Sequence, residues 1–176
     1  MAVLGLAAPC VTLSEAQAYV RVETGEEEAL LAGLIRTATD LCEAFLRQVV
    51  VSRAFEEDVT ASASWERLDT GPVRSIDAVA GVDAEGVEHA IPSSGYAVDI
   101  DARGDGWVRI LDTSFRRVRI SGMTGMAQDQ NGVPEAIRQG VLRLVAHLFT
   151  ARDAEGGEPP AAVTALWRPH RRMRLA

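Results

Sequence analysis

Two aspartates and a glycine in the middle of the chain have a spacing that partly matches a metal-binding loop. Asp99, Asp101 and Gly104 match positions one, three and six of a calcium-binding loop. Ile110 stands at position twelve, where such a loop needs a bidentate glutamate. We therefore expect a hairpin turn here, and we expect neither a metal nor any other cofactor.

The other residue types that carry catalysis do not form a catalytic pattern. The chain has no Gly-x-Ser-x-Gly turn, no phosphate-binding glycine loop and no dinucleotide-binding fingerprint. Cys10, Cys42 and three scattered histidines lack metal-ligand spacing, so we expect free thiols. His147 is expected to be a structural residue, and the acids at residues 56–58 a solvated edge. The sequence therefore predicts a protein that is not an enzyme.

A cluster of arginines closes the chain. All 18 basic residues are arginine, and residues 1–158 hold 14 of them with 25 acids, so this body carries −11 and the end of the chain +4. Such a tail could bind nucleic acid, could be a plain solvated terminus, or could insert into an acidic cleft of a partner protein. The acidic body would repel DNA, whereas tryptophan and arginine are enriched as interface anchors, so we favour a protein partner. The predicted partner-binding residues are Trp167, Arg168, His170, Arg171, Arg172 and Arg174.

Apolar residues at helical spacing predict the elements that must position this tail. A short helix is expected from Thr12 or Ser14 to about residue 20, and a longer one over 26–48. A central helix over 134–152 begins at Pro134 and presents one apolar face. The second and central helices should share a core.

Between those two helices the apolar period changes from 3.6 to 2, which predicts short strands joined by turns and hence an antiparallel sheet of hairpins. The predicted fold class is α+β, with long packed helices and the sheet inserted at about 49–121. We predict a helical core over 1–153, then a Gly/Pro hinge, a short helix and the basic tail over 154–176. No apolar run approaches the roughly 20 residues of a membrane span, so no membrane partner is expected.

Several motifs occur in an order that resembles a known family. They are Val-Thr-Leu-Ser-Glu-Ala at residues 11–16, the apolar run at 34–46, Gly-Pro-Val-Arg-Ser-Ile at 71–76, the strand at 95–99, and Val-Pro-Glu-Ala-Ile-Arg-Gln at 133–139. Together they resemble tailed-phage head-tail connector (adaptor) proteins, including the equivalent component of gene transfer agent particles. The Thr-Gly-Arg turn often found after the second helix in that family is replaced by Leu46-Arg47-Gln48.

The resemblance implies a virion structural protein that forms a ring, typically a dodecamer, at the head-tail junction. Its implied partners are the portal, which the C-terminal segment would reach, and a head-closure (stopper) or tail protein. DNA would pass through the channel without specific recognition, helped by an acidic wall that keeps it from sticking. The subunit would reside in the bacterial cytoplasm during assembly and then in the particle. The alternatives are a small nucleic-acid-binding protein that uses the arginine tail, and a ligand-binding module.

Overall fold

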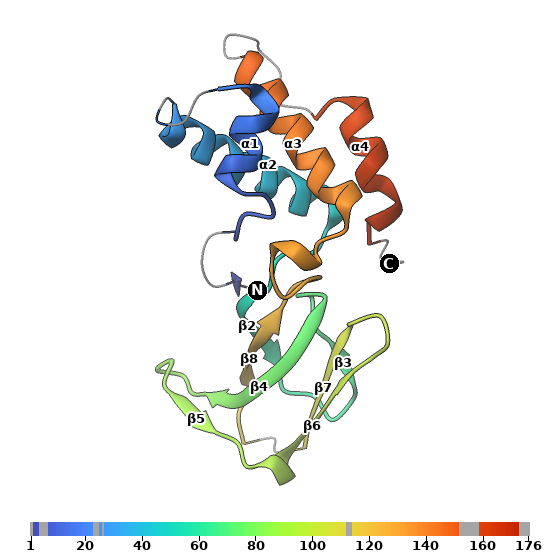
Figure 1. Cartoon of the computed structure of the whole chain (residues 1–176). Helices are drawn as coiled ribbons and strands as arrows, with labels where there is room; N and C mark the ends of the chain where they lie inside the picture. The colour runs from blue at the N-terminus through green and yellow to red at the C-terminus, as the bar shows by residue number, and fades with distance from the viewer. Residues whose placement is uncertain are drawn as a thin grey trace. The chain divides into compact units, whose positions relative to one another are not determined.

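The computed structural model describes residues 2–3, 7–22, 25, 27–111, 114–151 and 159–172. The chain divides into a helical unit (Ala7–Val51 and Ala127–Ala176) and a β unit (Met1–Leu6 and Ser52–Met126) (Figure 1). This arrangement confirms the predicted α+β class. The β unit begins and ends a few residues later than the predicted insertion, because residues 49–51 are buried with the helices.

The helical unit is built from α-helices whose bounds follow the predicted ones closely, together with two short 3-10 helices, η2 and η3, that were not predicted. They are α1 (Leu13–Val20), α2 (Glu28–Leu46), η2 (Gln130–Gly132), α3 (Glu135–Thr150), α4 (Ala161–Trp167) and η3 (Arg168–His170). Thr12 is the N-cap of α1, and its reciprocal bonds with Glu15 form a capping box. Both α1 and α2 pack against α3, as Figure 1 shows.

Helix α3 is the centre of this unit. Its buried side chains are Ile137, Val141, Leu142, Leu144 and Val145, which recur at the spacing that the sequence indicates. Pro134 takes the N-cap position rather than the first helical turn. The side chain of His147 is exposed, so the expectation of a structural role in the core was wrong for this residue.

The β unit contains two antiparallel sheets rather than the single sheet that we expected. The five-stranded sheet has the order β1-β2-β8-β4-β5, and the three-stranded sheet has the order β3-β7-β6. The strands are β1 (Ala2–Val3), β2 (Arg53–Thr60), β3 (Glu66–Arg67), β4 (Val73–Val82), β5 (Glu88–Ala90), β6 (Tyr96–Ile100), β7 (Gly106–Ile110) and β8 (Arg117–Thr124). The core of this unit lies among Phe55, Val79, Val108, Ile110 and Ile120.

The predicted turns divide between the two sheets. The turn before Gly86 joins β4 to β5, and the turn at residues 101–105 joins β6 to β7, so both are hairpins. Residues 92–95 instead contain η1 (Ser93–Gly95) and carry the chain from one sheet to the other. In β8, Arg117 and Arg119 are exposed or half-buried, whereas Val118 and Ile120 are buried, as the alternation predicts.

None of the described helices is both long and apolar enough to cross a membrane. Residues 159–172 pack with the helical unit, whereas residues 152–158 and 173–176 lie outside the described residues. The separate hinge and tail over 154–176 therefore stay a prediction.

Candidate functional site

Trp167 fixes the C-terminal segment on the helical unit. Its side chain is 0% exposed, and its Nε1 donates a hydrogen bond of 3.2 Å to the carbonyl oxygen of Ile137 in α3. Gly140 makes this approach possible, because a Cβ at that position would lie 2.1 Å from the indole Nε1. The ring of Phe45 in α2 completes the seat, with its centroid 5.9 Å from that of the indole. Helix α4 is thereby held against both α2 and α3.

This placement changes the role that the sequence suggested for Trp167. We predicted an anchor for a partner, but the indole is packed inside its own chain and is not offered to a partner in this conformation. A contribution of Trp167 to partner binding stays a prediction, and it would act by holding α4 in position. The signal in the sequence was the four-residue spacing of Val163 and Trp167, both buried, which marks an apolar helix face.

The residues after Trp167 gather at the C-terminal end of α2. Gln48 Nε2 donates a hydrogen bond of 2.5 Å to the carbonyl oxygen of His170. The backbone N–H of Arg172 donates a hydrogen bond of 3.0 Å to the carbonyl oxygen of Leu46. The guanidinium of Arg171 lies 5.4 Å from the centroid of the Phe45 ring. The end of a helix carries unsatisfied carbonyls and partial negative charge, which favours these cations here.

These contacts place three of the predicted partner-binding residues beside the end of α2, and Arg168 lies just before them in η3. We call Arg168, His170, Arg171 and Arg172 the basic cluster; Arg168 and Arg171 are exposed, and the other two are half-buried. Arg174 lies outside the described residues. The cluster can bind carboxylates or phosphates on a partner, because guanidinium groups donate paired hydrogen bonds to such groups.

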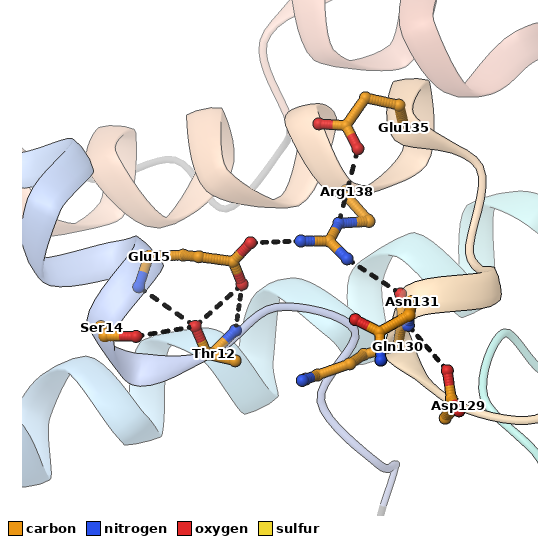
Figure 2. A network of polar contacts seen from close by, with 8 residues as sticks. All are labelled: Thr12, Ser14, Glu15, Asp129, Gln130, Asn131, Glu135 and Arg138. Atoms are coloured by element: carbon orange, nitrogen blue, oxygen red, sulfur yellow. Dashed lines mark hydrogen bonds and ion pairs between the residues drawn. The ribbon is translucent and has the colours of Figure 1, made fainter.

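A second polar network joins the start of α1 to the start of α3 (Figure 2). Arg138 donates hydrogen bonds to the Glu15 carboxylate and, over 3.0 Å, to the carbonyl oxygen of Gln130 in η2. Its Nε lies 3.7 Å from a carboxylate oxygen of Glu135. The bond from the Thr12 backbone is the largest cause of a lowered Glu15 pKa, and Arg138 lowers the pKa further. Since Arg138 is mostly buried, its role is to hold three segments together.

Two acids of β2, Glu57 and Asp58, are held by hydrogen bonds within the β unit. Glu57, which we expected on a solvated edge, is buried and accepts hydrogen bonds from the backbone N–H groups of Asp69 and Thr70, at 2.6 and 2.9 Å. Asp58 accepts two hydrogen bonds from Arg119, which lower its pKa. A hollow of about 760 Å³ lies beside Asp58, with Phe115 and Arg117 in its lining.

The described residues contain no cluster of three or more metal-ligating side chains. Cys10 and Cys42 are free and fully buried, and burial raises the pKa of the Cys10 thiol to about 11 and that of Cys42 further. Thiols so protonated are poor nucleophiles at neutral pH. The turn at Asp101, where we rejected a calcium loop, is closed by hydrogen bonds from the backbone N–H groups of Arg103 and Asp105 to its carboxylate.

Comparison with known proteins gives a consistent result. No family model and no curated protein matches the chain. Among solved structures, a chain in the neck of an empty GTA particle, computed with C6 symmetry, matches with a TM-score of 0.77 and 27% identity over 100% of this chain and 95% of that one. The resemblance to the head-tail connector family is confirmed.

Two further structures agree with this head-tail connector resemblance. A chain in the neck of a native GTA particle, computed with C12 symmetry, matches with a TM-score of 0.75 and 26% identity over 100% of this chain and 94% of that one. A chain in the virion of a native gene transfer agent (GTA) particle matches with a TM-score of 0.73 and 26% identity over 100% of this chain and 95% of that one. The likeness thus extends over both units of this connector-like protein.

Proposed function

We propose that the protein is a structural subunit of the neck of a phage-like particle, with no catalytic turnover. The supporting observation is the full-length likeness to chains of GTA necks, which covers nearly all of those chains as well. The symmetry of those necks, computed as C6 and C12, supports an oligomeric ring in the particle. Because necks and virions are structural assemblies, the likeness also supports a structural rather than an enzymatic role.

We further propose that the ring lies between the portal and the head-closure or tail proteins and lines the DNA channel. The basic cluster is the proposed portal-binding surface. It is positively charged on an acidic protein of net charge −7, so it can bind an acidic cleft that the rest of the chain would repel. Its backbone is bonded to the end of α2, which presents the arginines in a fixed place.

The test uses the full chain and its own portal. We expect wild-type protein to co-sediment with the portal and to appear as a ring by electron microscopy. The double variant Arg168→Glu/Arg171→Glu should bind the portal about tenfold or more weakly, because like charges across an interface cost more than an ion pair contributes. Arg143→Glu, an exposed site on α3, changes charge without touching the cluster and should bind as wild type.

Two outcomes would contradict this assignment. If both variants bind the portal equally well, the basic cluster is not the portal contact. If wild-type protein binds no portal but binds DNA with a steep salt dependence that the double variant loses, the nucleic-acid alternative holds instead.

A further inference from the structure

The outer surface of the three-stranded sheet carries an unusual set of side chains. Val108 and Ile110 of β7 are buried in the core, so Trp107 and Arg109, which alternate with them, lie on the opposite face. Arg67 pairs directly with Trp107 in the register and shares that face. Trp65 joins them, because the Arg109 guanidinium lies 5.1 Å from the centroid of its ring. We call Trp65, Arg67, Trp107 and Arg109 the Trp–Arg face.

This face has the properties of a protein-binding surface. It holds two of the three tryptophans of the chain, and Trp65 is 43% exposed although it is a large apolar residue. Trp65, Trp107 and Asp99 line a hollow of about 270 Å³. Tryptophan and arginine around a small pocket are the residues that dominate protein–protein binding energy. The buried Nε of Arg109 donates to no acceptor among the described residues.

A complementary surface lies elsewhere in the same β unit. The hairpin between β4 and β5 presents Val87, which is 54% exposed, between the exposed residues Glu85 and Glu88. We call these three residues the acidic hairpin. Asp83 holds this hairpin in place. Its carboxylate accepts a hydrogen bond of 2.7 Å from the backbone N–H of Val87 and lies 2.8 Å from His89 Nε2. Glu88 already pairs with Arg119 of its own chain, whose Nη1 lies 2.8 Å from its carboxylate. The remaining match is between Val87 with the Glu85 carboxylate and a hollow lined by two tryptophans and Asp99, with Arg67 on the same face.

The two surfaces are placed for contact between copies rather than within one copy. Strand β5 is the edge of the five-stranded sheet, and in Figure 1 it lies on the side of the β unit away from β3 and β7. A closed ring requires two different, complementary surfaces on every subunit, one for each neighbour. We infer that the acidic hairpin of one copy docks on the Trp–Arg face of the next, with Val87 in the hollow and Glu85 beside Arg67.

This inference rests on the proposed function, and a charge swap separates the two. The full chain is mixed with its own portal, and the fraction of portals that carry a complete ring is counted by electron microscopy. Arg67→Glu should place a glutamate against Glu85 of the neighbour and lower that fraction about tenfold or more. Glu85→Arg should do the same by placing two arginines together. The double variant Arg67→Glu/Glu85→Arg should restore rings, because the opposite charges then face each other again.

Arg74→Glu, at an exposed position of β4, is the matched control and should form rings as wild type. A thermal melt of each variant alone tests whether it is folded. The inference is overturned if Arg67→Glu behaves like the control, or if the double variant fails to restore rings. If wild-type protein forms no ring on the portal, the proposed function itself fails.

Discussion

At the scale of single residues, Glu15 links helix capping to the packing of the helical unit. It closes the capping box with Thr12 and also binds Arg138. The pKa of Glu15 is lowered in the folded protein, first by the hydrogen bond from the Thr12 backbone. Because the pKa is lowered, ionised Glu15 stabilises the fold at pH values above its pKa in the unfolded chain, about 4.3. This contribution is lost as the pH falls through the pKa that Glu15 has in the folded protein.

We predict that Glu15→Gln lowers the free energy of unfolding by about 1 kcal/mol at pH 7, because the bonds from Thr12 and Arg138 would then be accepted by a neutral amide instead of a carboxylate. The difference between variant and wild type should shrink as the pH falls below about 4, where the wild-type carboxylate is protonated. Urea denaturation at a series of pH values measures both effects. Glu135→Gln is the control. The Glu135 side chain is 82% exposed and its carboxylate lies 3.7 Å from Arg138 Nε, so this ion pair should contribute little to stability. An equal loss in the control would contradict the argument.

The two partners of Glu15 differ in how far the sequence could predict them. The Thr-x-x-Glu spacing before an apolar run marks a capping box, and the sequence indicated Thr12 as a cap. Arg138 lies 123 residues further along, and no local pattern connects a carboxylate with a cation at that separation. The burial of Glu57 could not be predicted for the same reason, because its carboxylate accepts hydrogen bonds from the backbone of residues 69 and 70, outside its own strand.

At the scale of elements, helices could be predicted and strand pairing could not. The bounds of α2 and α3 follow from apolar residues at helical spacing over several turns. Strand segments were also recognised, but division into two sheets depends on which strands pair, and β2 pairs with β8 far along the chain. Helix α4 has only seven residues, and so short a segment does not show which helix its apolar face packs against.

The seat of α4 yields a test at this scale. Alanine normally stabilises a helix interior relative to glycine, by about 1 kcal/mol. At Gly140 we predict the opposite, a loss of about 1–3 kcal/mol, because the new Cβ would overlap the buried Trp167 indole. Gly33→Ala in α2 is the matched control, since nothing lies within 4 Å of its Cβ position, and it should stabilise the protein. Thermal or urea unfolding measures both variants.

The same pair of variants tests whether α4 supports the basic cluster. If the cluster is presented by α4, then Gly140→Ala should also weaken portal binding, whereas Gly33→Ala should not. A destabilised Gly140→Ala protein that binds the portal as tightly as wild type would show that the arginines work without this seat. A stabilised Gly140→Ala protein would contradict the packing of Trp167 itself.

At the scale of the whole molecule, charge sets when the ring can form. Each copy carries −7, and bringing many copies together requires overcoming their mutual repulsion. The proposed contact between neighbours supplies only a few opposite charges around a small hollow. We therefore predict that the isolated protein is largely monomeric at low salt and that rings form on the portal, which holds the copies at high local concentration.

Light scattering over a salt series measures this balance. Raising ionic strength from about 0.01 M to 0.1 M shortens the screening length from about 30 Å to 10 Å, so the repulsion between whole subunits weakens before contact pairs do. The mean mass of isolated protein should therefore rise with salt over this range. Binding to the portal through the basic cluster should weaken over the same range, because it depends on attraction of opposite charges. A stable ring of isolated protein in low-salt buffer would show that subunit contacts outweigh the repulsion without a portal.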